Sequence, residues 1–204
     1  MRFSKIAVLA VVGLSLGGCG YNRIQELDEA AEQAKSNIGV QLTARNQLIP
    51  NLVATVKGAA EFERGTQTDI ARARAGQLTA AEQQLTQARQ QSQAAVQSGD
   101  VAQLQQADAA TARSIGTYLN IAVEAYPQLR ATQNFTGLQD QLSESENKIA
   151  QARTDYNEAV RVYNSYIRQF PQAMTARVTG AERKQPYQAP AGSETAPTVD
   201  FGTP

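Results

Sequence analysis

The chain has 204 residues, enough for one domain with a sizeable core, and its 19 basic residues balance 19 acidic ones. Without a leader that carries Arg2 and Lys5, 17 basic and 19 acidic side chains remain, a net charge of −2, which indicates no nucleic-acid partner. The chain has no histidine, which excludes Ser–His and Cys–His nucleophile pairs and His-based zinc sites. A carboxylate metal site stays open, but no ligand loop of the calcium type occurs. The sequence therefore predicts no catalytic residue, metal or other cofactor.

The first residues have the order of an export signal. Met1 to Lys5 carries two positive charges, Ile6 to Leu16 is almost entirely apolar, and two glycines follow. This is the pattern of a secretory signal peptide, predicted here over residues 1–18. The apolar run is well short of the roughly 20 residues that a membrane-spanning helix needs, so a spanning helix is the weaker interpretation.

Cys19 is the only cysteine and ends the segment "LGGC". This segment resembles the lipobox of bacterial lipoproteins, which implies that the Cys19 sulfur receives diacylglycerol and that Cys19 becomes the mature N-terminus. Two or three acyl chains, at about 0.8 kcal/mol per buried CH₂, anchor a protein stably in a membrane. The alternatives are an incidental cysteine or a free thiol awaiting a partner. By the same resemblance, Gly20 in place of Asp argues against inner-membrane retention and for the outer membrane if the organism is Gram-negative.

The apolar spacing from Ile24 onward predicts a long first helix. Steps of three and four residues continue to Val56, and no strong turn cluster interrupts them before Gly58. Pro50 removes one backbone donor within this helix. Because the apolar row runs through it, we expect a kink near Ile49 and not a loop.

Two short motifs predict the next helix boundaries. The segment "TAAE" at residues 79–82 has the form of a capping box and predicts the start of a second helix. The segment "SGD" at residues 98–100 predicts a stop followed by a fresh N-cap. A third helix then continues to Pro127.

The fourth predicted helix, residues 134–170, has the clearest pattern. Its apolar row alternates steps of three and four over five heptads, which demands a helical partner. The row consists of Phe135, Leu138, Leu142, Ser145, Ile149, Ala152, Tyr156, Ala159, Tyr163, Tyr166 and Phe170.

Residues 177–204 are rich in Pro, Ala, Gly, Ser and Thr and are expected to form an extended or disordered tail. Docking of Tyr187, Val199 and Phe201 on the bundle is the alternative to a free terminus.

Three stretches carry a resemblance to a known family. They are "YNRIQELDEAAEQAKSNIGVQLTARNQLIPNLVATVKGAAEFE", "EAYPQLRATQNFTGLQDQL" and "ENKIAQARTDYNEAVRVYNSYIRQFP". With "TVDFG" near the C-terminus, the chain resembles the LemA family of bacterial membrane-associated helical proteins. The resemblance implies an all-α fold, an elongated antiparallel four-helix bundle over residues 19–176, with no assigned catalytic residues. The chain departs from the family in its lipobox, in Lys35 where Trp is common, and in Phe62 where His is common.

Arg45 falls on the apolar row of the first helix. A buried guanidinium needs a partner, which could be supplied by Glu124, Glu144 or Glu158. The alternative is that the stem of Arg45 covers the core while its head reaches water. A third interpretation is a polar groove at Pro50, with Asn51, that receives a ligand.

These patterns predict a non-enzymatic envelope lipoprotein on the exported face of the cell. Lipid at Cys19 would hold one end of a rod at the membrane, and the sides of the rod would face a protein partner. The alternative is a ligand-binding or catalytic bundle that uses carboxylates and tyrosines in its core. Carboxylate catalysis would need two acids facing one cleft, and the sequence shows no convergent pair.

Overall fold

The computed structural model describes the backbone of residues 2–62 and 69–188, and the side chains of residues 20–61 and 75–188. Within these ranges the chain is all-helical, as predicted. The elements in chain order are α1 (Arg2–Phe62), α2 (Asp69–Ser98), α3 (Val101–Ala125), the 3-10 turn η1 (Pro127–Ala131), α4 (Gln133–Tyr166) and α5 (Gln172–Thr179). No helix within the described ranges is both long and apolar enough to cross a bilayer.

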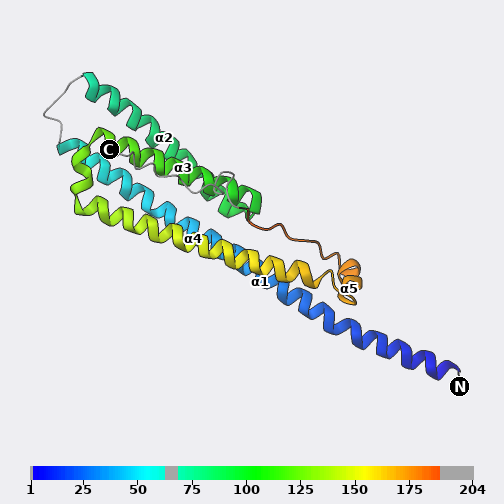
Figure 1. Cartoon of the computed structure of the whole chain (residues 1–204). Helices are drawn as coiled ribbons and strands as arrows, with labels where there is room; N and C mark the ends of the chain where they lie inside the picture. The colour runs from blue at the N-terminus through cyan, green and yellow to red at the C-terminus, as the bar shows by residue number, and fades with distance from the viewer. Residues whose placement is uncertain (1, 63–68, 189–204) are drawn as a thin grey trace, which may run out of the picture.

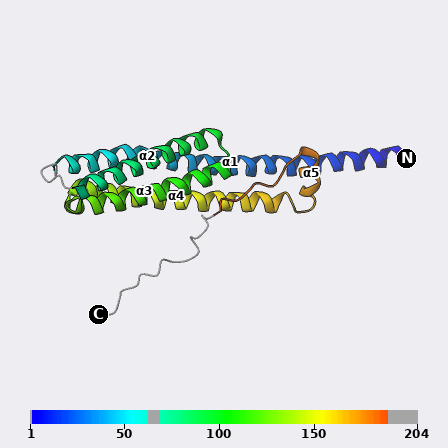
Figure 2. The same ribbon diagram turned by 90° about the horizontal axis from the view of Figure 1, so that it is seen from above.

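The helices form an elongated bundle of two antiparallel pairs. α1 packs mainly against α4, and α2 packs mainly against α3, while α1 also contacts α2. The α2–α3 pair lies beside only the part of α1 and α4 that is farther from the N-terminus (Figure 1). Seen from above, the other part of the α1–α4 pair carries α5 and an extended segment that returns along α4 (Figure 2).

The buried apolar residues form three clusters along the rod. The distal cluster, farthest from the N-terminus, is built around Leu52, Leu85, Tyr118 and Phe135. The middle cluster contains residues such as Ile38, Leu104 and Ile149. The proximal cluster consists of Ile24, Leu27, Tyr163, Ile167 and Ala176. Because the first cluster residue is Ile24, the packed core begins within five residues of Cys19.

The predicted boundary between the second and third helices is confirmed. Gly99 has φ +65°, a left-handed conformation that closes α2. The Asp100 carboxylate then accepts a hydrogen bond from the backbone N–H of Gln103 at 2.8 Å, which is the expected N-cap. The first helix also runs through Pro50 without a loop, as predicted.

Two sequence-based assignments are wrong. Thr79 does not cap a helix, because α2 already begins at Asp69, and the Thr79 hydroxyl donates to the Ala75 carbonyl within it. Phe170 does not join the core of the fourth helix, since α4 ends at Tyr166 and the Phe170 side chain is 83% exposed. Near the end of α4, Val160 is buried in the core and Ala159 only partly so.

Candidate functional site

A cluster of charged residues is buried where α1, α3 and α4 meet. Arg45 on α1 is 0% exposed, and its Nη1 donates to Glu146 Oε1 on α4 at 2.7 Å. The same nitrogen lies 3.0 Å from Asp108 Oδ1 on α3, and Arg45 Nη2 donates to the Asp108 carbonyl oxygen at 3.4 Å. One guanidinium therefore binds two helices through three contacts.

The Asp108 carboxylate is the centre of this cluster and is 1% exposed. Its Oδ2 pairs with Arg153 Nη2 from α4 and accepts a hydrogen bond from the Tyr187 hydroxyl at 2.7 Å. The Tyr187 ring lies against the Arg153 guanidinium, 5.4 Å from ring centre to Cζ. We call Arg45, Asp108, Glu146, Arg153 and Tyr187 the buried charge cluster, in which two positive charges face two negative ones.

The expectation that the Arg45 head reaches water is wrong, because the whole side chain is enclosed. The three partners suggested for it are wrong as well, since Glu144 pairs with Lys148, Glu158 pairs with Arg161, and Glu124 is exposed. Because it is sealed from solvent, Arg45 lines no groove at Pro50. Asp108 was not predicted from the sequence, although its position could have revealed it. Asp108 lies on the apolar row of α3 between Leu104 and Ile115, as Arg45 lies on the apolar row of α1.

The segment after α5 is docked on the bundle in an extended conformation. Gly180, with φ +70°, ends α5, and residues 181–188, which we call the strap, run back along α4. Of the residues expected to dock or form a free tail, Tyr187 is buried against the bundle. Val199 and Phe201 lie outside the described residues.

Two asparagines of α4 bind the strap backbone in the same way. The Asn164 side chain donates to the Lys184 carbonyl at 2.8 Å and accepts from the Lys184 N–H at 2.9 Å. Asn157 donates to the Tyr187 carbonyl at 2.9 Å and accepts from the Tyr187 N–H at 2.7 Å. Seven helical residues rise roughly 10 Å and three extended residues span roughly 10 Å, so the two repeats match in length.

The strap also carries a charged anchor, Lys184. Its Nζ lies 2.7 Å from Glu32 Oε1 and 3.1 Å from Asp28 Oδ1, both on α1. Burial alone would lower the pKa of Lys184, but the hydrogen bonds and charges of Glu32 and Asp28 outweigh it and raise that pKa. Burial alone would raise the pKa of Glu32, but the hydrogen bonds and charges of Lys184 and Lys35 hold it below its ordinary value.

These shifts predict a pH window for the strap. Because the pKa of Glu32 is lowered by folding, its contribution is complete above the ordinary carboxyl pKa and is lost as the pH falls through the folded value. Because the pKa of Lys184 is raised, its contribution is complete below the ordinary amine pKa and is lost as the pH rises through the folded value. Glu32 is partly exposed, so the effect stays under about 1 kcal/mol.

The window is measured by following the Lys184 amide chemical shift in ¹⁵N-labelled protein as the pH is lowered and raised from neutrality. In Lys184→Met both transitions should disappear, because the charge pair is gone. Identical titration curves in the two proteins would contradict the assignment of these transitions to the pair.

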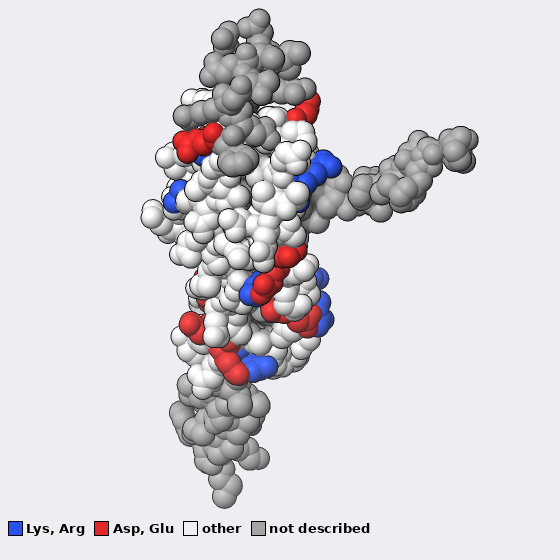
Figure 3. All heavy atoms as spheres, turned by 90° about the vertical axis from the view of Figure 1, so that its left-hand side faces the viewer, with Lys and Arg blue, Asp and Glu red and all other residues white. Residues whose placement is uncertain are grey.

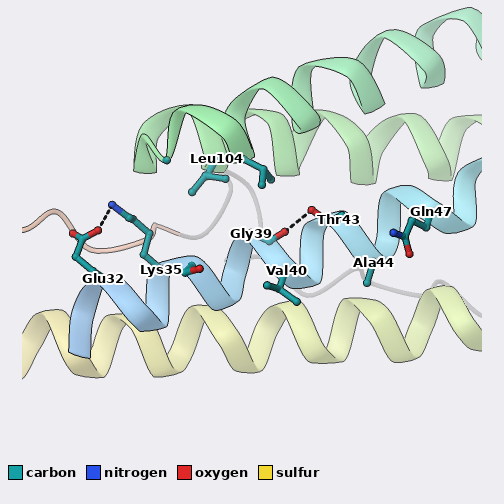
Figure 4. Close-up of a pocket in the computed structure, with 11 residues that line it drawn as sticks. Glu32, Lys35, Gly39, Val40, Thr43, Ala44, Gln47 and Leu104 are labelled. Atoms are coloured by element: carbon teal, nitrogen blue, oxygen red, sulfur yellow. Dashed lines mark hydrogen bonds and ion pairs between the residues drawn. The ribbon is translucent and has the colours of Figure 1, made fainter. Parts of the chain in front are cut away.

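A groove of about 520 Å³ lies beside α1 where the α2–α3 turn passes it (Figure 4). Its lining includes Gly39, Val40, Val96 and Leu104, and Val40 is 59% exposed. Three of its polar side chains are already paired, since Glu32 binds Lys35 and the Thr43 hydroxyl donates to the Gly39 carbonyl at 2.8 Å. Around Val40 and Val96 the groove thus offers an apolar packing surface.

The charges on the distal end of the rod are mixed. Figure 3 shows mostly uncharged residues on this face, with acidic and basic side chains close to one another. Among the described residues, no group of three or more Asp, Glu or Cys side chains is arranged to hold a metal ion. Neither observation adds a candidate site to the buried charge cluster and the groove.

The predicted lipidation site stands at the other end of the rod. The backbone of Cys19 is part of α1, and its side chain lies outside what the structure describes. At the next residue, a Cβ added to Gly20 would meet Thr175 Oγ1 at 3.6 Å and Gln172 Cγ at 3.8 Å. α5 therefore packs against α1 directly beside the predicted anchor.

Comparison with known proteins places the chain in a family. The chain is 27% identical over 201 residues to the magnetosome proteins MamQ 1 and MamQ 2 of Paramagnetospirillum magneticum, covering 94% of this chain and 73% of each relative. It is 25% identical over 181 residues to the magnetosome protein MamQ of Magnetospirillum gryphiswaldense, covering 84% of this chain and 66% of the relative. A family model described as the LemA family matches residues 34–201. This match spans most of the helical bundle and the strap, and the chain therefore belongs to the LemA family.

Proposed function

We propose that this LemA-family protein is a non-enzymatic envelope lipoprotein that holds a stiff helical rod at a membrane surface for a protein partner. The observation that carries the proposal is the direct connection between the lipobox and the rod. α1 is helical on both sides of Cys19, and Ile24 is already buried in the proximal cluster. An anchor at Cys19 would thus leave no flexible linker, and the lipid would fix the position of the rod as well as its location.

The length of α1 sets how far the rod would reach. From Gly20 to Phe62, a rise of 1.5 Å per residue gives roughly 60 Å. A protein that only needed attachment would tolerate a loose connection, whereas a rigid one of this length suits the positioning of a partner at a set height. The groove beside Val40 and the mixed charges of the distal end offer side surfaces for such contacts.

The chemistry of the interior supports a non-enzymatic role. The buried charge cluster balances its charges internally and is closed to solvent at Arg45 and Asp108. A catalytic carboxylate pair would have to face a cleft that admits substrate. The cluster instead joins three helices and the strap, which is the role of a structural contact.

Replacing Cys19 by serine tests the anchor. Serine offers no sulfur for alkylation. In cells labelled with a fatty-acid analogue, the Cys19→Ser protein should therefore carry no label and should be absent from the mature, lipid-modified protein in the membrane fraction. The control is Ser36→Cys combined with Cys19→Ser, which restores a thiol outside the lipobox and should restore no label. Unchanged labelling of Cys19→Ser would remove the lipoprotein proposal.

In a Gram-negative host, we expect the wild-type protein in the outer-membrane fraction.

The partner is tested in the same cells by photo-crosslinking from single positions. A cross-linker at Val40 probes the groove, and one at Arg130 probes the distal end. We expect a discrete protein adduct from one of these faces that weakens in Cys19→Ser, because positioning requires the anchor. Adducts that persist unchanged without the lipid would contradict a role for tethering.

A further inference from the structure

The large exposed apolar side chains of the described bundle are Tyr21, Val40, Phe170, Met174 and Val178. Most of them lie at one end of it. All except Val40 belong to the start of α1, the α4–α5 turn or α5. If exposed apolar side chains were placed at random along the rod, they would not concentrate at the end that carries the predicted lipid.

The geometry of α5 explains why these side chains have no cover. Gln172 and Thr175 face Gly20 of α1, and Ala176 is buried in the proximal cluster. Met174 and Val178 are four residues apart, so they share a helical face that is turned away from this contact. They are 64% and 88% exposed, and Phe170 in the preceding turn is 83% exposed. We call Phe170, Met174 and Val178 the α5 apolar patch.

The charges of the segment that carries the patch are mostly positive. Arg168, Arg177 and Arg183 are exposed in the stretch of residues 167–183, which contains one acidic residue, Glu182. Apolar side chains flanked by arginines form the pattern of a segment that lies in a membrane interface, where the stems stay among acyl chains and the guanidinium groups reach phosphates. Each arginine near an anionic bilayer adds to the attraction.

We propose that the α5 apolar patch docks on a bilayer that contains anionic lipid, with α5 lying at the level of the headgroups. This inference rests on the proposed anchoring at Cys19, because acyl chains on that residue would enter the membrane one residue from the Gly20–α5 contact. The patch then fixes the rod by a second contact beside the lipid. We favour a bilayer as the surface that covers the patch, because an anchor at Cys19 would bring the patch to the membrane. The alternative is that a second copy of the chain covers it.

The chain has no tryptophan, so single tryptophans report position without background. The lipidated Met174→Trp protein is reconstituted with vesicles of phosphatidylcholine and phosphatidylglycerol whose acyl chains carry bromine. We expect its emission to shift to shorter wavelength and to be quenched by the brominated chains. Val40→Trp is the matched control, since Val40 is also exposed and apolar but lies beside the groove, and its emission should not change.

A second measurement removes the lipid. The mature chain is produced from Gly20 onward, which keeps every residue of the three core clusters. We expect it to bind phosphatidylglycerol-containing vesicles more tightly than vesicles of phosphatidylcholine alone. Replacing Met174 and Val178 together by serine should weaken that binding at least about tenfold, because two apolar side chains lose their burial. Unchanged circular dichroism would show that the variant is folded.

The outcomes separate this inference from the anchor. If the lipidated Met174→Trp protein floats with vesicles while its tryptophan stays unquenched, the anchor stands and the patch contact is overturned. If Cys19 carries no lipid but the chain from Gly20 binds anionic vesicles through Met174 and Val178, the anchor fails and the patch contact stands. Self-association without vesicles that is lost in the serine variant would assign the patch to a second copy and overturn the bilayer contact.

Discussion

Replacing Asp108 by alanine is expected to lower the free energy of unfolding by about 3–5 kcal/mol, the cost of breaking a buried ion pair by removing one partner. Asp108 is 1% exposed, forms ion pairs with Arg45 and Arg153, and accepts a hydrogen bond from the Tyr187 hydroxyl. Without its carboxylate, Arg45 stays enclosed with Glu146 as its one remaining carboxylate partner. The loss is measured by urea unfolding followed by circular dichroism.

Matched variants separate charge from packing at this position. Asp140→Ala removes an exposed carboxylate from α4 and should change the free energy of unfolding by no more than about 0.5 kcal/mol. Combining Arg45→Met with Asp108→Ala removes both members of the pair, so the double variant should lose less stability than the sum of the single variants. Strict additivity, or a loss under about 1 kcal/mol for Asp108→Ala, would contradict the central position of this carboxylate.

Replacing Tyr187 by alanine is expected to free the strap and to cost about 3–5 kcal/mol, the range for truncating a buried aromatic side chain. Tyr187 donates to Asp108, stacks on Arg153, and is almost fully buried. Burial and the negative charge of Asp108 raise the pKa of Tyr187, so the hydroxyl keeps its proton and stays a donor. Amide exchange at Lys184 and Tyr187 measures the release, since their N–H groups are bound by asparagines of α4.

Tyr187→Phe keeps the ring and removes only the hydroxyl. It should cost about 1–2 kcal/mol, because the Asp108 oxygen loses one of its donors but keeps Arg153. Tyr21→Ala is the control for losing a tyrosine at an exposed site and should have little effect. Protected strap amides in Tyr187→Ala would show that Asn157 and Asn164 hold the segment without the aromatic anchor.

Local patterns predicted most of the helices, because each depends on neighbours in the chain. The apolar rows placed α1 and α4, and Asp100 capped α3 where the sequence indicated. The pattern failed at Phe170, which has heptad spacing but follows the end of α4, because spacing cannot show where the helix stops. It failed at Thr79 because a cap motif inside a helix has the same letters as one at its start.

The contacts between distant segments could not be predicted in the same way. Arg45 was singled out on its apolar row and Asp108 was not, and their pairing depends on how the whole bundle places α1 and α3. The strap was harder still, because its sequence is that of a loose tail. Its order comes from Asn157 and Asn164, whose spacing matches an extended backbone only once α4 is formed.

The unequal lengths of the two helix pairs have a mechanical consequence. The half of the rod nearer the N-terminus contains α1 and α4 with the short α5 and the strap, whereas the farther half contains the α2–α3 pair beside α1 and α4 (Figure 1). Resistance of a beam to flexing rises steeply with its cross-section. A lateral force on the end far from the N-terminus would therefore bend the molecule mainly in its thinner half. Undocking of the strap would reduce the stiffness of that half further.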